Sequence, residues 1–355
     1  MSDLRRLFDE VAVPRRTGST AHARVRAVLT RELRQRGFVV LEQPFAVHPP
    51  GRLAGPYLAG GMLAASSVLV AALAALPPPN PSALLAGALG VALLLCFGVL
   101  VASIRHPPLA AVNLIAVRPQ ARVKVWLAAH YDSKGQPLSM FSRIVAGALS
   151  LVGACALAVL AATRLSGTVW DVSTAALVAS PGLVGGMLLL GNRVTDGSPG
   201  ALDNATALVT VFSIIDRLPP EAAVGVLLPD AEEFGLLGAK ALVNERANLL
   251  EGTAVLNFDG IDDRGSTIGL VHRAGPVSEA VTRALGAKRR RLLPVVVDGW
   301  ELARRAAECV TIMRGDWRTS LIVHTPRDEA NRLTLEGSTA VAAAVAGALQ
   351  DLLLR

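Results

Sequence analysis

Charge is scarce in this chain of 355 residues. Asp, Glu, Lys and Arg together make up 18% of it, compared with about 25% in an average soluble protein. Hydrophobic residues reach 52%. This combination excludes a disordered or fibrous chain, because disorder needs high charge and low hydrophobicity. It also disfavours an ordinary soluble globule, whose surface needs more polar side chains.

Cysteines and aromatic residues are also few. The three cysteines, Cys96, Cys155 and Cys309, form no CxxC pair, which excludes a disulfide framework and a cysteine-based structural zinc site. Aromatic residues make up 4%, and no stretch interleaves them with basic residues. The formal net charge of +7 therefore favours contact with anionic lipid, and no nucleic-acid partner is predicted. The basic run at 288–291 is interpreted as a solvated face.

Long uncharged runs are what the chain has in place of charge. Four segments have the length needed to cross a hydrocarbon core of about 30 Å. They contain none of the 35 basic and 28 acidic residues, and they lie at 57–77, 83–104, 144–163 and 172–192. Because the proline-rich run at 77–81 reads as a turn, the pattern predicts two transmembrane hairpins. The expected partner is a lipid bilayer crossed by four transmembrane helices.

The arginines that flank these segments predict their orientation. The side that holds the N-terminus and the long polar segments carries Arg52, Arg105, Arg143 and Arg193. The opposite side offers only Arg164, countered by Asp171. Because positive residues concentrate on the cytoplasmic side of a membrane, we expect an integral protein of the cell membrane with its polar bulk in the cytoplasm.

The polar remainder alternates between strand and helix patterns. Expected strands lie at 38–41, 111–117, 123–129, 224–228, 254–258, 267–271 and 321–323. Expected helices run from 20 to about 36, over 205–218, over 236–250, before 286, and from 333 onward. Such alternation predicts a three-layer α/β fold with a mostly parallel mixed sheet. We expect a single domain, residues 1–355, interrupted by transmembrane hairpins at 57–104 and 141–192.

Metal-binding side chains follow several of the expected strands. Each alone has an ordinary interpretation as a cap, a turn residue or a surface residue. Charged groups at buried strand ends are costly unless they are paired or bind metal, so their joint occurrence indicates a site. These residues are His130, Asp132, Glu232, Glu233, Asp259 and His324, together with Asp203 in a glycine-flanked turn.

Five motifs around these residues occur in a recognisable order. They are His-Tyr-Asp at 130–132, Gly-Ala-Leu-Asp-Asn at 200–204, Asp-Ala-Glu-Glu-Phe-Gly-Leu-Leu-Gly at 230–238, Asn-Phe-Asp at 257–259 and His-Thr-Pro-Arg-Asp at 324–328. With them, the sequence resembles the co-catalytic dizinc exopeptidases typified by aminopeptidase Y, the secreted bacterial leucyl aminopeptidases and glutamate carboxypeptidase II.

The resemblance implies a site with two zinc ions as cofactors. It implies that His130 and Asp259 bind one zinc, and that Glu233 and His324 bind the other. Asp203 would bridge the two ions. Imidazole and carboxylate are ligands that zinc accepts, so the residue types agree with this assignment.

The resemblance also implies the catalytic groups. Glu232 would act as the general base, and Asp132 would orient His130. We therefore expect a membrane-anchored zinc exopeptidase acting on peptides, and an aminopeptidase in particular. A carboxypeptidase or a glutaminyl cyclase on the same fold, or a non-catalytic membrane receptor or scaffold, are the alternatives. Since cyclisation uses one zinc, the full two-metal ligand set favours hydrolysis.

Overall fold

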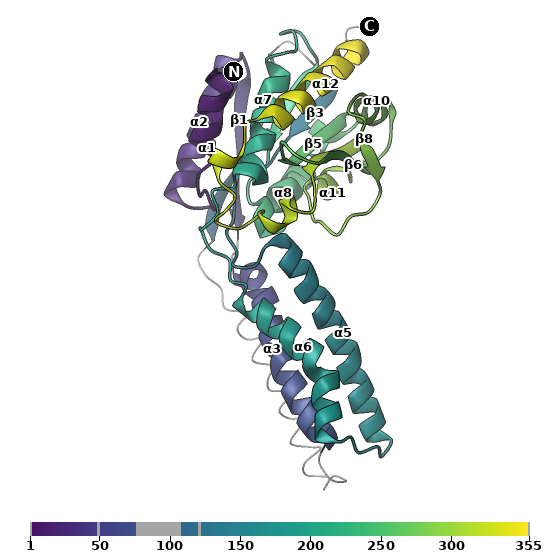
Figure 1. Ribbon diagram of the computed structural model, residues 1–355. Helices are drawn as coiled ribbons and strands as arrows, with labels where there is room; N and C mark the ends of the chain where they lie inside the picture. The colour runs from purple at the N-terminus through teal and green to yellow at the C-terminus, as the bar shows by residue number, and fades with distance from the viewer. Residues whose placement is uncertain (1, 48–49, 76–107, 120–121, 354–355) are drawn as a thin grey trace. The chain divides into compact units, whose positions relative to one another are not determined.

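The computed structural model describes residues 2–47, 50–75, 108–119 and 122–353 (Figure 1). The chain divides into two compact units. Unit 1 comprises Met1–Val47, Pro108–Gly135 and Thr195–Arg355, and unit 2 comprises His48–Pro107 and Gln136–Val194.

Unit 1 is built on one sheet of eight described strands. In chain order they are β1 (Val39–Val47), β2 (Leu109–Val117), β3 (Val125–Ala128), β4 (Val224–Leu228), β5 (Ala254–Ile261), β6 (Ser266–Arg273), β7 (Lys288–Arg290) and β8 (Glu308–Gly315). Their order across the sheet is β1-β2-β4-β3-β5-β8-β6-β7. The centre, β4-β3-β5-β8, is parallel. The pairs β1–β2, β2–β4 and β6–β8 are antiparallel, so the predicted α/β fold with a mixed sheet is confirmed.

Helices cover both faces of this sheet. Along β3, Val125 and Leu127 enter one hydrophobic core, whereas Trp126 and Ala128 enter another. The first core is shared with α1 (Ser2–Val11), α2 (Thr20–Gln35), α7 (Thr206–Ile215), α10 (Pro276–Ala284) and α12 (Glu336–Leu353). The second is shared with α8 (Leu237–Glu245), α9 (Ala247–Leu250) and α11 (Gly299–Leu302). Because strand side chains alternate between faces, these buried strands are apolar on both sides.

The segment before His324 is not a strand, and this prediction was wrong. Thr319–Leu321 forms a 3-10 turn, and the backbone N–H of Val323 donates to the carbonyl of Thr319. The turn is held locally, because Asp316 accepts the backbone N–H of Thr319 and donates its own to the Thr319 hydroxyl. The strand that pairs with β5 is β8, with Val310 opposite Leu256. A run of three apolar residues could not compete with this local bonding.

The basic run at 288–291 lies at an edge of the sheet. Its first three residues form β7, which pairs only with β6 among the described strands. All three side chains are exposed. Charged side chains on an edge strand oppose pairing with another chain, which agrees with a solvated face.

Unit 2 contains three described helices, α3 (Pro50–Ala75), α5 (Met140–Leu165) and α6 (Val172–Gly191). All three are long and apolar enough to cross a membrane. They correspond to three of the four predicted spans. The fourth, at 83–104, lies outside the described residues. Helix α5 begins before its predicted span because Ser139 caps it, and Arg143 within its first turn donates to Gln136.

Glycines bring the helices of unit 2 into close contact. A Cβ atom on Gly153 of α5 would lie 2.1 Å from the Cα atom of Gly182 in α6. A Cβ atom on Gly186 would lie 2.5 Å from the carbonyl oxygen of Gly60 in α3. Gly182 and Gly186 are spaced as in a GxxxG motif. Gly182 lies close to both α5 and α3, where Ser67 is its neighbour, and Gly186 lies close to α3.

Both insertions leave and re-enter unit 1 at residues that are paired within it. Val47, the last residue of β1, lies opposite Leu109, the first residue of β2. Gly135 and Thr195 exchange two backbone hydrogen bonds of 2.9 and 2.7 Å. Unit 1 is thus closed by its own contacts at both points.

Candidate metal centre and active site

The carboxyl ends of the central parallel strands carry the candidate site. Because β3, β4 and β5 run in the same direction, the residues that follow them meet at one edge of the sheet. His130 follows β3, and Glu232–Phe234 forms a 3-10 turn after β4. Asp259 lies near the end of β5. Asp203 lies in the turn Ala201–Ala205 before α7, and it precedes a cis peptide bond.

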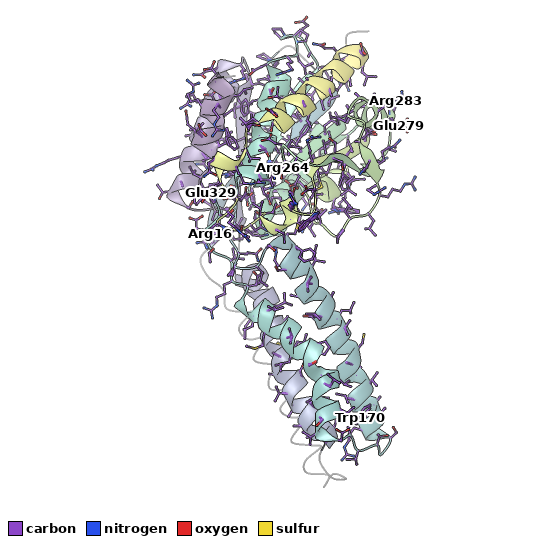
Figure 2. All side chains as sticks on the ribbon, viewed as in Figure 1. Arg16, Trp170, Arg264, Glu279, Arg283 and Glu329 are labelled. Carbon is purple, nitrogen blue, oxygen red and sulfur yellow. The ribbon has the colours of Figure 1, made fainter. Side chains whose placement is uncertain are left out.

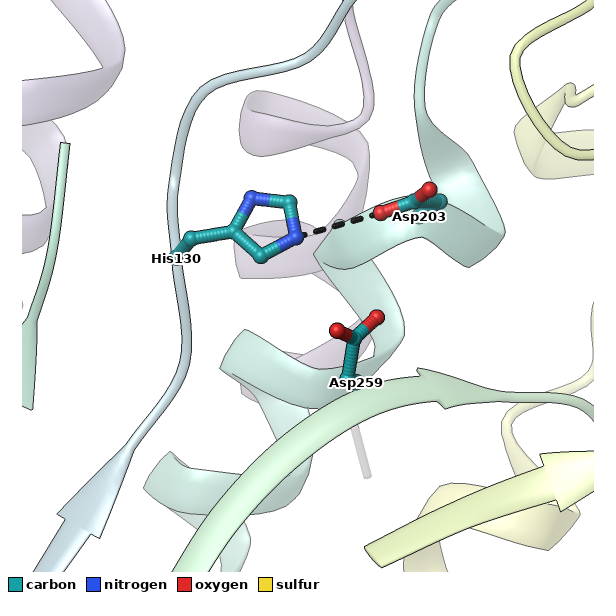
Figure 3. A group of neighbouring side chains, drawn as sticks. All are labelled: His130, Asp203 and Asp259. Atoms are coloured by element: carbon teal, nitrogen blue, oxygen red, sulfur yellow. Dashed lines mark ion pairs between the residues drawn. The ribbon is translucent and has the colours of Figure 1, made fainter. Parts of the chain in front are cut away.

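The structure brings all five predicted ligands together. His130, Asp203 and Asp259 form one group in which the candidate ligand atoms lie within 4.8 Å of one another (Figure 3). Asp203, Glu233 and His324 form a second group within the same limit. Asp203 belongs to both groups, so it lies between them.

The two carboxylate oxygens of Asp203 face different imidazoles. Oδ1 lies 3.2 Å from Nε2 of His130, and Oδ2 lies 2.9 Å from Nε2 of His324. His324 Nε2 also lies 2.9 Å from Oε1 of Glu233. His324 has a positive φ of 67°. That left-handed backbone belongs to a loop, and not to the strand end predicted from the sequence.

Two buried carboxylates hold the turns that carry these residues. Asp132 accepts the backbone N–H of Glu232 at 3.1 Å and that of Glu233 at 3.2 Å. Its Oδ1 also lies 3.4 Å from Nδ1 of His130. Asp328 accepts the backbone N–H of Asp203 at 3.1 Å, and its other oxygen accepts that of the preceding residue at 2.7 Å. Charge-assisted bonds of this kind fix a turn more firmly than neutral ones.

A buried arginine joins the loops that precede the ligands. The Arg15 guanidinium donates to the carbonyl oxygens of Tyr131 at 2.8 Å, Pro199 at 2.6 Å and Gly200 at 3.0 Å. Its backbone N–H donates to the Ser133 hydroxyl at 3.1 Å. Burial lowers the pKa of Arg15 to about 10. The N-terminal segment is therefore part of the framework of the site.

Opposite charges balance at the centre of the site. Burial disfavours the charged form of His130, but the carboxylates of Glu232, Asp132 and Asp203 outweigh it and hold the pKa of His130 well above its ordinary value. Burial also opposes ionisation of Asp203. His130 and His324 outweigh that effect and hold the pKa of Asp203 well below its ordinary value.

The pKa values of two acidic groups in the site, Glu232 and Asp259, are raised instead. Burial, reinforced by the Glu233 carboxylate, raises the pKa of Glu232 well above its ordinary value despite the attraction of His130. Burial and the Asp203 carboxylate raise the pKa of Asp259 to about 7. The site therefore holds more acid groups than its own imidazoles can neutralise, as expected where a cation binds.

Two residues near the site were not predicted from the sequence. Asp298, directly before α11, is buried, and neither of its carboxylate oxygens has a hydrogen-bond partner among the described residues. Burial, reinforced by the nearby Asp132 and Asp259 carboxylates, raises its pKa to about 8. The sequence feature that could have indicated Asp298 is the apolar run Val295-Val296-Val297 directly before it. Lys134 is the second residue, and its Nζ lies 2.6 Å from Oε2 of Glu233.

The residues present fit zinc. Oδ1 of Asp203 and Oε1 of Glu233 are buried and accept no hydrogen bond of good geometry from the described residues, although imidazole nitrogens lie close to both. Buried carboxylate oxygens in this condition are costly unless they bind a cation. Imidazole nitrogens and carboxylate oxygens are the donors that catalytic zinc uses. The structure thus contains candidate metal-binding groups at the predicted residues.

Residues 186–349 match the sequence profile of peptidase family M28. The match includes the turn that carries Asp203 and the motifs from Glu232 to His324, and it begins after the segment that carries His130. No curated protein gives a significant match to the chain.

Solved structures share the fold. The zinc aminopeptidase BSAP from Bacillus subtilis is 12% identical, with a TM-score of 0.60, and the match covers 99% of this chain and 94% of that chain. An aminopeptidase from Aneurinibacillus sp. strain AM-1 is 13% identical, with a TM-score of 0.54 and coverage of 99% and 93%. A glutaminyl cyclase from Fimbriiglobus ruber is 14% identical, with a TM-score of 0.55 and coverage of 98% and 92%. At these identities the likeness concerns the fold alone.

The family match confirms the predicted resemblance to the co-catalytic zinc exopeptidases. The matched segment includes four of the five candidate ligands, and the α/β fold is shared with solved zinc aminopeptidases. The similarity of residues 186–349 to peptidase family M28 indicates a zinc metallopeptidase, and hence a hydrolase.

Proposed function

We propose that this chain is a membrane-anchored zinc exopeptidase, and that its activity is that of an aminopeptidase. The observation that carries the proposal is the position of Asp203, whose two oxygens face His130 and His324 in two adjoining ligand groups. A carboxylate shared in this way is suited to bridge two metal ions. In the proposal His130 and Asp259 would hold one zinc, Glu233 and His324 would hold the other, and Asp203 would be shared between them.

The residues of the chain have separate tasks in this proposal. Zinc would supply polarisation of the scissile carbonyl and a more acidic attacking water. Glu232 is the general base that takes the proton from the attacking water and passes it to the leaving amine. Asp132 holds the backbone of Glu232 and Glu233 and lies beside His130. It therefore positions the base and two ligands at once.

Membrane anchoring is the second part of the proposal. We place α3, α5 and α6 in the bilayer together with the segment at 83–104, so that one peptidase domain, residues 1–355, is interrupted by hairpins at 57–104 and 141–192. Trp170, in the connection between α5 and α6, donates from Nε1 to the Thr163 hydroxyl (Figure 2). Tryptophan is typical of the membrane–water interface. The flanking arginines favour a cytoplasmic peptidase unit.

Glutaminyl cyclase activity is the second candidate, because two glutaminyl cyclases share the fold with TM-scores of 0.55 and 0.53. Metal content and substrate preference together distinguish the candidates. The full-length protein is purified in detergent, its zinc content is measured, and it is assayed with aminoacyl, carboxy-terminal and N-terminal glutaminyl substrates. Two zinc ions per chain with release of N-terminal residues supports the aminopeptidase. One zinc with cyclisation and no hydrolysis contradicts it.

A further inference from the structure

The two carboxylate oxygens of Glu233 have different partners. Oε1 lies 2.9 Å from Nε2 of His324, within the ligand group that includes Asp203. Oε2 lies 2.6 Å from Nζ of Lys134. The Glu233 side chain is 2% exposed and that of Lys134 is 15% exposed, so water screens this ion pair only weakly. None of the five motifs of the sequence includes Lys134.

The loop that carries Lys134 is fixed on both sides. The backbone N–H of Ser133 donates to the carbonyl of Arg15, and Gly135 exchanges two hydrogen bonds with Thr195. The lysine ammonium is therefore delivered to Glu233 from a constrained backbone. A long lysine side chain loses considerable conformational freedom when it is held, so the geometry of the loop has to offset that cost.

We propose that Lys134 is a positioning residue for the metal group formed by Asp203, Glu233 and His324. This inference rests on the proposed function. By holding Oε2, Lys134 restricts Glu233 to a single donor atom, Oε1. A carboxylate that used both oxygens would fill a further coordination position, and catalytic zinc sites keep one position open. The lysine thus reserves that position for water or substrate.

Lys134 also offsets part of the negative charge of the group. Two carboxylates and a neutral imidazole attract a divalent cation, and an ammonium ion on one of the carboxylates weakens that attraction. Even with the screening of bulk water, a dielectric constant of about 80, a unit charge at roughly 5 Å changes the binding of a divalent cation by about tenfold, which sets a lower bound for this buried pair. A zinc ion at this group would consequently be held less tightly. Because its carboxylate ligand is partly neutralised by Lys134, the ion would polarise a bound carbonyl or water more strongly.

The test compares Lys134→Met, which keeps the length of the side chain without its charge, with Lys134→Arg, which keeps the charge. Zinc affinity of the full-length protein in detergent is measured by competition with a chelator, and ligand number by X-ray absorption at the zinc edge. We expect Lys134→Met to retain the more weakly held zinc at least about tenfold more tightly and to gain one oxygen ligand. Lys134→Arg should resemble the wild type.

Lys288→Met, on the exposed edge strand β7, serves as the matched control and should leave both measurements unchanged. Circular dichroism confirms that each variant is folded before metal is measured. Unchanged or weaker zinc binding in folded Lys134→Met, with unchanged ligand number, overturns the inference. Failure of the proposed function is a different result, because the wild type would then hold no zinc pair at all.

Discussion

Asp132 and Asp328 show how single buried side chains organise the site. Each uses both carboxylate oxygens to accept backbone N–H groups from a turn that carries a candidate ligand. Neither is among the proposed ligands. Their effect on the metal is indirect, since a turn that shifts by even 1 Å would misplace a ligand. The same logic applies to Lys134, which acts on Glu233 from outside the ligand set.

Glu232 should be dispensable for metal binding and required for turnover. We expect Glu232→Gln to keep its zinc and to lose at least about a hundredfold in kcat, because the amide cannot accept the proton of the attacking water. Zinc analysis and steady-state kinetics on an aminoacyl substrate provide the measurement. Glu279→Gln, an exposed residue on α10 (Figure 2), is the control. Normal turnover by Glu232→Gln would show that another group is the base.

His272 should make stability sensitive to acid. Burial lowers its pKa to about 4, and its Nε2 lies 2.9 Å from the Thr311 hydroxyl. The unfolded chain takes up this proton near pH 6.5, whereas the folded chain does so only near pH 4. Stability from this group is therefore present above pH 6.5 and is lost as the pH falls toward 4.

The measurement compares metal-free wild type and His272→Gln in detergent. The thermal midpoint of the wild type should fall more steeply between pH 6.5 and 4, because glutamine takes up no proton in this range. Parallel curves for the two proteins would mean that His272 is not held neutral by burial.

The site residues that could be predicted from the sequence are those that lie in short motifs of neighbouring residues. His130, Asp203 and Glu233 lie in motifs of adjacent residues, so their meeting at one sheet edge could be predicted. Lys134 and Asp298 could not be assigned in this way. Their significance depends on contacts with residues about 100 positions and more than 30 positions away, respectively, and no local pattern records such contacts.

At the scale of elements, the strands that were predicted well are those whose two faces are both buried. Strands β3, β4 and β5 are short apolar runs that the two hydrophobic cores bury on both faces, a pattern typical of parallel sheets. The failure at 321–323 has the opposite cause. Thr319 and Asp316 satisfy the backbone locally there, and local side-chain bonds compete with strand pairing.

The packing of α5 against α6 should depend on Gly153. A Cβ atom at this position would lie 2.1 Å from Gly182, so Gly153→Ala should force the helices apart and cost about 1–3 kcal/mol. Thermal unfolding in detergent provides the measurement. Gly147→Ala in the same helix is the matched control, since the described residues leave open space there. Equal midpoints for the two variants would contradict close packing at Gly153.

At the scale of the whole molecule, unit 1 should fold without unit 2. The insertions begin and end at the paired residues Val47 with Leu109 and Gly135 with Thr195. We expect a chain in which short turns replace 48–108 and 136–194 to fold and to bind as much zinc as the full protein. Circular dichroism and zinc analysis provide the measurement. An unfolded product, or one without zinc, would show that unit 2 contributes to the site.

The pairing of Gly135 with Thr195 also bears on the order in which the chain folds. Val125 of β3 pairs with Val224 of β4, although about 100 residues separate them. Once α5 and α6 have formed a hairpin, its ends are already together, and the loop that must close shortens to about 40 residues. The entropic cost of closure falls by about 1 kcal/mol, and pairings of lower effective contact order form faster. The inserted helices thus bring the two ends of a long connection together and shorten the effective distance along the chain between β3 and β4.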